Sequence, residues 1–158
     1  MHITQFTDYA LRVLIYLGTN DDRRVTIQEI AERFDVSRNH LMKVVNELIR
    51  NGYASGVRGK GGGLRLACPP EEIVIGAVVR HMEPGMNLVE CFASTGCHCI
   101  LDPHCQLKSA LTRALDAFLG VLDELTLADM LGSEEQRILR TSSPPQRHDA
   151  VRIAQSRN

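Results

Sequence analysis

Residues 26–52 have the sequence TIQEIAERFDVSRNHLMKVVNELIRNG, which holds two helical patterns separated by a tight turn at Asp35 and Val36. Thr26 and the glutamate three residues later form a capping-box pattern at the start of the first helix. Ser37 is a good N-cap for the second helix, whose apolar residues recur at helical spacing, and Gly52 follows that helix as a C′ glycine would. Two short helices joined in this way predict a helix-turn-helix unit.

The polar face of the second of these helices is the expected DNA-reading surface. Its side chains can donate hydrogen bonds to base edges and phosphates in a major groove. They include Ser37, Arg38, Asn39, His40 and Lys43. The alternative is an ordinary helical hairpin with a solvated polar face, which the residues that follow disfavour.

Two short strands are predicted at residues 53–58 and 63–67, on either side of the tip Gly59-Lys60-Gly61-Gly62. A β-hairpin directly after a recognition helix is the wing of a winged helix. Glycines allow a close approach to phosphates, and Arg58 and Lys60 are expected to supply the positive charge. No Walker or Rossmann pattern surrounds these glycines, so a nucleotide-binding loop is disfavoured.

Basic charge is concentrated in this part of the chain, although the formal net charge of the whole chain is −1. Residues 37–67 contain six Lys or Arg and one Glu, whereas residues 68–158 contain eight Lys or Arg and twelve Asp or Glu. A basic patch on an otherwise acidic chain indicates a surface that binds phosphate.

The rest of the chain has mainly helical patterns. Helices are predicted over residues 3–17, 71–82, about 106–125 and 127–139. The predicted fold is therefore mainly α with a small β-hairpin wing, a winged helix-turn-helix plus a long dimerisation helix. The expected divisions are a DNA-binding domain at 1–70, a cysteine-rich loop and dimerisation helix at 71–131, and a largely disordered tail at 132–158.

The longest predicted helix has a heptad pattern of apolar residues. They are Leu107, Leu111, Ala114, Phe118, Val121 and Leu125, at alternating spacings of four and three. One edge of this stripe is expected to pack on the first helix and the other on a second copy of the chain. The alternative is a helix buried wholly within its own domain. We expect a homodimer, since two-fold symmetry suits palindromic double-stranded DNA.

Four of the five cysteines lie within residues 91–105, in a stretch with Gly and Pro that predicts a loop. Clustered thiolates are ligands for an iron–sulfur cluster or a soft metal. No signal peptide or membrane span is visible, so we expect a cytoplasmic protein, where thiols stay reduced and metal is favoured over disulfide. A zinc site that also uses His98 or His104 is the alternative. No Cys/His catalytic arrangement is visible, and an enzyme is not expected.

With these motifs the chain resembles the NsrR-type repressors, nitric-oxide-sensing members of the IscR-like family of winged-helix iron–sulfur regulators. The resemblance covers residues 1 to about 131. It rests on TDYALR at 7–12, VSRNHLMKVV at 36–45, GKGGGLR at 59–65, Cys91-Phe92, CQLKSAL at 105–111 and FLGVLDELTLADML at 118–131.

The resemblance implies a homodimer that represses nitric-oxide detoxification genes while its cluster is intact and releases DNA on nitrosylation. A [4Fe–4S] cluster is favoured over [2Fe–2S]. The spacing typical of the family favours Cys91, Cys99 and Cys105 as ligands, with Cys97 in place of Cys99 as the alternative. The resemblance also places Asp8 near the cluster of the other subunit as a fourth ligand. The alternative for Asp8 is a solvated ion pair with Arg12. The alternative for the function is a regulator of the same family that senses iron–sulfur status or redox state.

Overall fold

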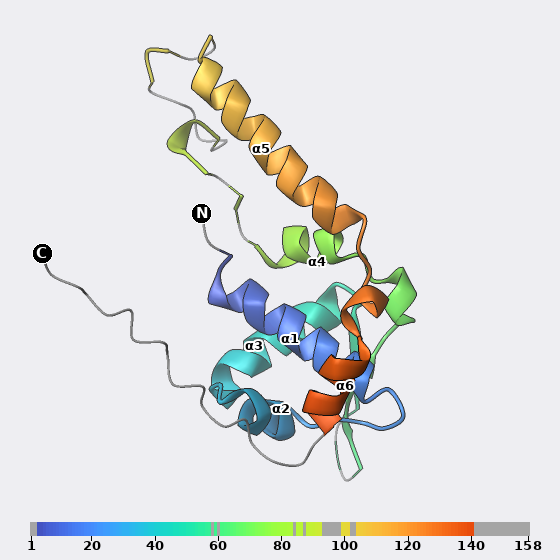
Figure 1. Ribbon diagram of the computed structural model, residues 1–158. Coiled ribbons are helices and arrows are strands. Elements are labelled where there is room, and N and C mark those ends of the chain that lie inside the picture. Colours follow the sequence, from blue (N-terminus) through green and yellow to red (C-terminus); the bar gives the residue numbers. More distant parts are fainter. Residues whose placement is uncertain are drawn as a thin grey trace, which may run out of the picture.

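The computed structural model of the protein describes residues 3–57, 59, 61–83, 85–86, 88–92, 99–101 and 104–140. Figure 1 shows a small helical body that carries a β-hairpin at one end and a long projecting helix at the other. The α-helices and strands are α1 (Gln5–Thr19), α2 (Ile27–Phe34), α3 (Arg38–Arg50), β1 (Ala54–Val57), β2 (Gly63–Leu66), α4 (Ile75–Met82), α5 (Gln106–Asp123) and α6 (Ser133–Arg140). Short 3-10 turns occupy Pro70–Glu72, Glu90–Phe92 and Ala128–Met130. The predicted mainly α fold with a hairpin wing is confirmed.

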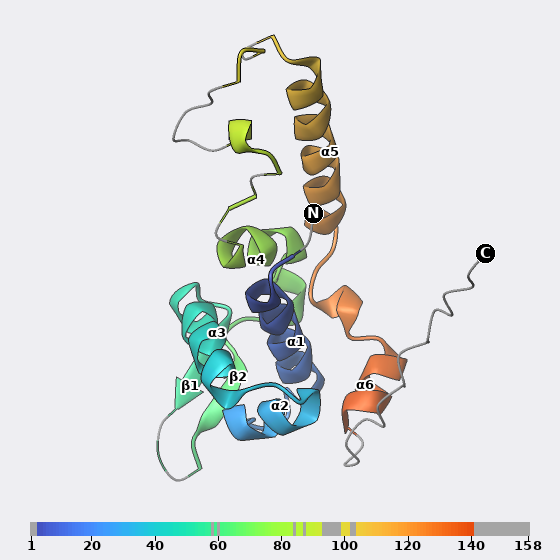
Figure 2. The same cartoon turned by 90° about the vertical axis from the view of Figure 1, so that its left-hand side faces the viewer.

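Helix α1 lies at the centre of this body. Its inward face carries Ala10, Val13, Leu14 and Leu17, none more than 1% exposed. It packs against α3, β2, α4 and α6, and Figure 2 shows those elements around it. The helical spacing of the apolar residues places them on one face, and their burial there supplies much of the hydrophobic stabilisation.

The helix-turn-helix forms as predicted, with one difference at its second cap. The Thr26 hydroxyl accepts the Glu29 backbone N–H at 3.1 Å, and Asp35 ends α2 in the left-handed conformation at φ 52°. Ser37 occupies the N-cap position of α3, but its side chain makes no capping hydrogen bond. The exposed hydroxyl of Ser37 therefore does not stabilise the start of the helix, and the prediction of a side-chain cap was wrong.

The wing is a two-stranded antiparallel hairpin in which Ala54 pairs with Leu66 and Ser55 with Arg65. Val25 adds a bridge to this hairpin, because its N–H donates to the Leu64 carbonyl at 3.0 Å and its carbonyl accepts the Leu64 N–H at 2.7 Å. The loop between α1 and α2 is thus joined to the wing, which fixes the hairpin relative to the helix-turn-helix.

Helix α4 begins later than the predicted start at residue 71. Val74 is extended and forms a β-bridge with Thr126, so the chain before α4 pairs with the chain after α5. Two backbone hydrogen bonds close this bridge, from Ile75 N–H to the Leu125 carbonyl at 2.9 Å and from Leu127 N–H to the Ile73 carbonyl at 2.8 Å. This pairing holds the two ends of the segment 75–125 together.

Helix α5 packs mainly on α4 and not mainly on the first helix, against which its inner edge was expected to pack. Arg80 and Asp123 form a bidentate ion pair between α4 and α5, with N–O distances of 2.5 and 2.7 Å. Gly76 lies directly beneath this pair, where a Cβ atom would clash with an Asp123 carboxylate oxygen. The ion pair and this close approach orient the base of α5, while its other end projects away from the body (Figure 1).

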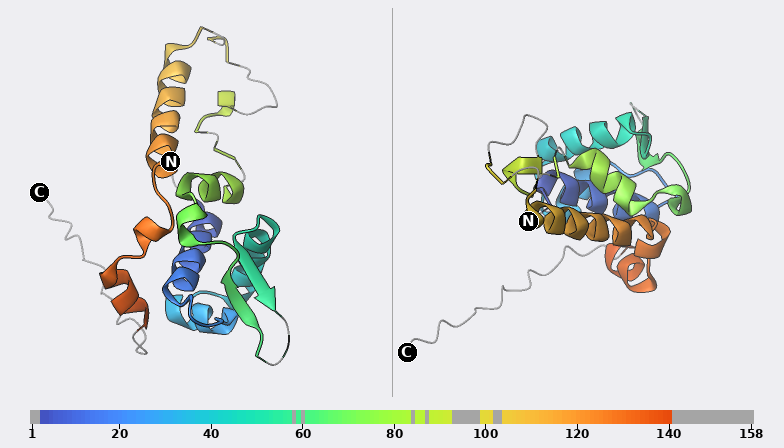
Figure 3. Two further views of the ribbon diagram at one scale, coloured as in Figure 1. Left: turned by 90° about the vertical axis from the view of Figure 1, so that its right-hand side faces the viewer. Right: turned by 90° about the horizontal axis from the view of Figure 1, so that it is seen from above.

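The predicted terminal helix over 127–139 is divided in two by the structure. Leu127 is fully buried, the chain turns through Ala128–Met130, and only then does α6 begin. Arg140 Nε donates to the Thr19 carbonyl at 3.0 Å and Arg33 donates to the Ile138 carbonyl, so α6 is attached to α1 and α2. Figure 3 shows α6 on the opposite side of α1 from the hairpin. Of the largely disordered tail expected at 132–158, residues 133–140 form α6, and the residues from 141 onward lie outside the described part of the chain.

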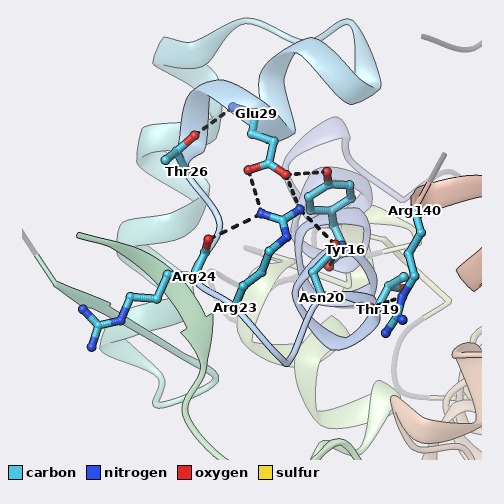
Figure 4. A network of polar contacts seen from close by, with 8 residues as sticks. All are labelled: Tyr16, Thr19, Asn20, Arg23, Arg24, Thr26, Glu29 and Arg140. Carbon is cyan, nitrogen blue, oxygen red and sulfur yellow. Dashed lines mark hydrogen bonds and ion pairs between the residues drawn. The ribbon is translucent and has the colours of Figure 1, made fainter. Parts of the chain in front are cut away.

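A polar network holds the loop between α1 and α2 (Figure 4). Glu29 was expected to complete the capping box, and a hydrogen bond from the Thr26 backbone is among the causes that lower the pKa of its carboxyl group. The same carboxylate also accepts hydrogen bonds from Arg23 and from the Tyr16 hydroxyl, the latter at 2.9 Å. Arg23 also donates to the Asn20 side chain at 2.9 Å. The hydrogen bond from Arg23 lowers the pKa of Glu29, and burial raises the pKa of Tyr16. The network therefore ties the C-terminal end of α1 to the start of the helix-turn-helix.

Glu29→Gln is expected to lower the free energy of unfolding at neutral pH by about 1–2 kcal/mol, because it removes a charged acceptor from three donors. A carboxyl group whose pKa is lowered by folding stabilises the protein above its ordinary pKa, and this contribution is lost as pH falls through the lower folded value. The difference between wild type and variant should therefore shrink as pH falls below about 4. Denaturant unfolding at pH 7 and pH 3 measures the difference in unfolding free energy between wild type and variant. Glu32→Gln on the exposed side of α2 is the matched control.

Candidate functional site

The expected reading surface is the exposed face of the first turns of α3. Ser37, Arg38, Asn39, His40 and Lys43 are all exposed there, while Leu41, Val44, Val45 and Leu48 on the opposite face are buried. The apolar residues hold the helix against the body, so its polar residues project outward as a group. The structure thus brings the five predicted reading residues together on one surface.

A groove of about 540 Å³ separates this helix from the wing. Arg38 and Asn46 line it from α3, and Gln28 lines it from the first turn of α2. Residues of the hairpin, including several of its glycines, form the other wall. Gln28 was not among the predicted site residues. Its position in the sequence could have indicated it, because Gln28 follows the Thr26 cap at the start of α2. The N-terminus of a helix carries a partial positive charge that favours a phosphate.

The tip of the hairpin turns sharply where the chain has glycines. Gly59 and Gly61 have φ values of +96° and +77°, and the Gly62 N–H donates to the Gly59 carbonyl at 2.9 Å. Residues with side chains rarely adopt these angles, so glycine suits the tip. Arg58 and Lys60, the predicted phosphate-binding residues, lie outside the described residues. Arg65 on β2 is an exposed cation of the same hairpin.

The segment between α4 and α5, which contains Cys91, Cys99 and Cys105, lies at the end of the molecule away from the wing (Figure 1). Cys91 is half-buried in the turn Glu90–Phe92, and Cys99 is exposed. Cys105 is the N-cap of α5, where its sulfur accepts the Lys108 N–H at 3.4 Å. Backbone N–H donors to sulfur stabilise a thiolate and are a usual feature of protein-bound clusters. Cys97 and His98 lie outside the described residues, and His104 is exposed.

Within the described part of the chain, no three His, Cys, Asp or Glu side chains are gathered closely enough to hold a metal ion. The chemistry of the donors nevertheless fits a thiophilic group, since three of the four clustered cysteines are half-buried or exposed rather than buried in the core. Cys68 differs from them because it packs against the hydrophobic core, where burial raises the pKa of its thiol. Cys68 is therefore a packing residue.

Asp8 is paired with Arg12 of the same helix turn. The Arg12 Nη2 atom lies 2.8 Å from one carboxylate oxygen and Nε lies 3.0 Å from the other, and the two side chains are 45% and 43% exposed. The Arg12 guanidinium also lies 5.9 Å from the centroid of the Phe34 ring. In a single chain Asp8 therefore forms the solvated ion pair with Arg12. Its role as a ligand to the cluster of a second subunit stays a prediction.

The chain was compared with known proteins. The Rrf2 family model, described as an iron-dependent transcriptional regulator, matches residues 3–133. The chain is 52% identical over 142 residues to the HTH-type transcriptional regulator NsrR of Geobacillus kaustophilus, covering 89% of this chain and 95% of that protein. It is 46% identical over 136 residues to NsrR of Bacillus subtilis, covering 85% of this chain and 93% of that one.

Solved structures show the same fold. CymR (YrzC), the global cysteine regulator of B. subtilis, matches with a TM-score of 0.69 and 27% identity, covering 83% of this chain and 96% of that one. IscR of T. potens matches with a TM-score of 0.65 and 27% identity, covering 83% and 86%. No helix of the described residues is both long and apolar enough to cross a membrane. The chain belongs to the Rrf2 family of transcriptional regulators and, within it, to the NsrR-type regulators.

Proposed function

We propose that the protein is a homodimeric DNA-binding repressor, not an enzyme, whose iron–sulfur cluster senses nitric oxide. The observation that carries the proposal is the arrangement of two sites in one chain. An exposed polar helix face adjoins a glycine-tipped wing at one end, and a cysteine segment leads into an exposed helix at the other. In this proposal residues 1–70 bind DNA, residues 71–131 carry the cluster and the dimer helix, and residues 132–158 form the tail.

The DNA-binding part of the proposal places α3 in a major groove of the operator. Arg38, Asn39, His40 and Lys43 would face the bases, because they share the exposed first turns of the helix. Ser37 would contact a phosphate, since its hydroxyl is not used for capping. The groove between α3 and the hairpin would receive the DNA backbone, with Arg58 and Lys60 of the wing supplying charge.

Arg38→Ala is expected to cost about 1–3 kcal/mol of binding free energy on the operator and to relax specificity, as for loss of a base-edge contact. Lys60→Ala should weaken binding to all DNA sequences alike and should reduce the slope of log affinity against log salt concentration by about one. Fluorescence anisotropy over a salt series measures both effects. Arg137→Ala on α6 removes the same charge far from the reading helix, and an equal loss in this control would contradict the assignment.

The dimer part of the proposal rests on the exposed side of α5. The predicted heptad is divided in the structure, because Leu111, Phe118 and Leu125 are half-buried against their own chain while Leu107 and Val121 are more than 60% exposed. The exposed face continues as a row with spacings of three and four: Leu107, Ala110, Ala114, Ala117 and Val121. Small residues along such a seam let two helices approach closely. A second copy of α5 would cover this row about a two-fold axis.

Ala114→Glu should leave each chain folded, because Ala114 is exposed, but should raise the dimer dissociation constant by about 100-fold or more. An unpaired carboxylate buried between two helices costs several kcal/mol. Sedimentation velocity at micromolar concentration measures the change. Ser109→Glu, exposed on another side of the same helix, is the control that keeps the dimer. A stable dimer in Ala114→Glu would move the interface elsewhere.

For the cluster we propose Cys91, Cys99 and Cys105 as ligands, with the partner subunit's Asp8 as the fourth, and [4Fe–4S] as the cluster type. The support is the donor chemistry: three accessible thiols on one segment and a half-exposed carboxylate on the first turn of α1. When bound, the cluster supplies iron that reacts directly with nitric oxide. Cys105 would hold its ligand position through the Lys108 N–H at the start of α5, which ties the ligand to the dimer helix. Asp8 would have to leave Arg12 to serve as a ligand.

Cys99→Ser should abolish the cluster whereas Cys97→Ser should keep it. Cys68→Ser, which alters a packing residue, should also keep it. Anaerobic absorption spectra and iron and sulfide analysis measure the cluster content, and a colourless protein that contains zinc would instead support the structural-metal alternative. The opposite pattern for Cys97 and Cys99 would exchange their roles. Asp8→Ala should leave folding intact but change the spectrum or the rate of reaction with nitric oxide.

The overall proposal is tested by titrating the anaerobic, cluster-loaded protein with nitric oxide while measuring its affinity for DNA. Affinity should fall with added nitric oxide. If affinity instead follows the supply of iron and sulfide and does not change with nitric oxide, the protein is a sensor of iron–sulfur status.

A further inference from the structure

The N-terminus of α1 is held by a carboxylate from the end of α4. Glu83, the C-cap residue of α4, uses its Oε2 atom to accept the Thr7 hydroxyl at 2.7 Å, the Thr4 hydroxyl at 3.0 Å and the Thr4 backbone N–H at 3.1 Å. Thr7 is completely buried and Thr4 and Glu83 are half-buried. We name these three residues the α1–α4 clamp.

The clamp has a defined pattern of hydrogen bonds. Each threonine hydroxyl has one proton to donate. When both hydroxyls donate to Glu83, no hydrogen bond joins the two hydroxyl oxygens, which lie 3.2 Å apart. The Thr7 backbone N–H then donates to the Thr4 hydroxyl, at the longer distance of 3.4 Å. The Thr4 side chain caps α1 only weakly, and the Glu83 carboxylate supplies the negative charge that a helix N-terminus favours. Glu83 is thus the strongest acceptor at this end of α1.

The clamp lies between the cysteine segment and the reading helix. On one side, the chain that leaves Glu83 leads within eight residues to Cys91. On the other side, the first turns of α1 and α3 share a cavity of about 260 Å³, with Phe6 and Tyr9 facing His40 and Lys43. Asp8, the candidate ligand toward a second subunit, directly follows Thr7. A displacement of Glu83 would therefore move the turn that carries Asp8 and the wall against which the reading residues rest.

We infer that Glu83 is a positioning residue that couples the state of the cysteine segment to the orientation of α3. This inference rests on the proposed function, since it assigns the route by which the cluster controls DNA binding. With the clamp closed, a change in residues 84–105 is transmitted to α1 through three hydrogen bonds to one oxygen atom. With the clamp removed, α3 keeps its fold, because the apolar face of α1 is unchanged, but it no longer responds to the cluster.

The test measures the ratio of DNA affinities of the cluster-loaded and cluster-free dimers. The probe is a duplex selected from random-sequence DNA by the loaded wild-type protein. Wild type is expected to show a ratio in the range of about 5–150-fold. Glu83→Ala should bring it to within about two-fold of one, at unchanged cluster content. Glu83→Gln, which keeps an oxygen acceptor, should give an intermediate ratio, and Thr7→Val, which removes the shortest hydrogen bond, should also lower it.

Glu71→Gln, an exposed carboxylate before α4, is the control that keeps the wild-type ratio. A Glu83→Ala protein whose loaded and cluster-free forms lose affinity equally would show a purely structural role and would overturn the inference. Loss of the cluster in Glu83→Gln, with cluster-free DNA binding unchanged, would make Glu83 a ligand and would also overturn it. If Glu83→Ala does not fold, the ratio of affinities measured for Thr7→Val alone decides whether the inference holds. A wild-type ratio of one would instead overturn the proposed function, and this inference with it.

Discussion

Burial of one face of α1 is the interaction on which the rest of the structure depends. Reading helix, wing, α4 and C-terminal helix all pack on this one helix, whose inward residues Ala10, Val13, Leu14 and Leu17 are almost fully buried. Hydrophobic contact is non-directional, so it brings these elements together without setting their angles precisely. Polar contacts at the two ends of α1 set the orientation of these elements.

Those end contacts differ in what they connect. At the C-terminal end, Tyr16, Arg23 and Glu29 join α1 to the start of the helix-turn-helix, and Arg140 attaches α6 to the Thr19 carbonyl. At the N-terminal end, Glu83 joins α1 to the chain that enters the cysteine segment. Helix α3 therefore rests on an element whose two ends are held by different parts of the chain. In the coupling that we infer, a change at the cysteines reaches α3 through the N-terminal end of α1 and not through the wing.

The long helix α5 is joined to this body near its C-terminal end. The β-bridge between Val74 and Thr126 and the ion pair between Arg80 and Asp123 set its direction. Its exposed row of small and apolar side chains extends along most of the helix, from Leu107 to Val121. A second copy of α5 is the partner that we propose for this row. The dimer would then place two reading helices at a separation determined by the α4–α5 junction.

The helices, the wing and the grouping of reading residues on α3 could be predicted from the sequence, because apolar periodicity, Thr26, Gly52 and the glycine-rich tip act within a few residues of one another. The clustered cysteines could be recognised for the same reason. Tertiary structure alone decided the contacts between distant residues. Glu29 joins Arg23 and Tyr16 in addition to its place in the capping box. Val74 pairs with Thr126 and delays the start of α4, and the heptad of α5 is divided between its own chain and an exposed face. Glu83 caps a helix 79 residues away. Local patterns determine which residues form a helix or strand, whereas the partner of a charged side chain or an apolar stripe depends on which elements packing brings beside it.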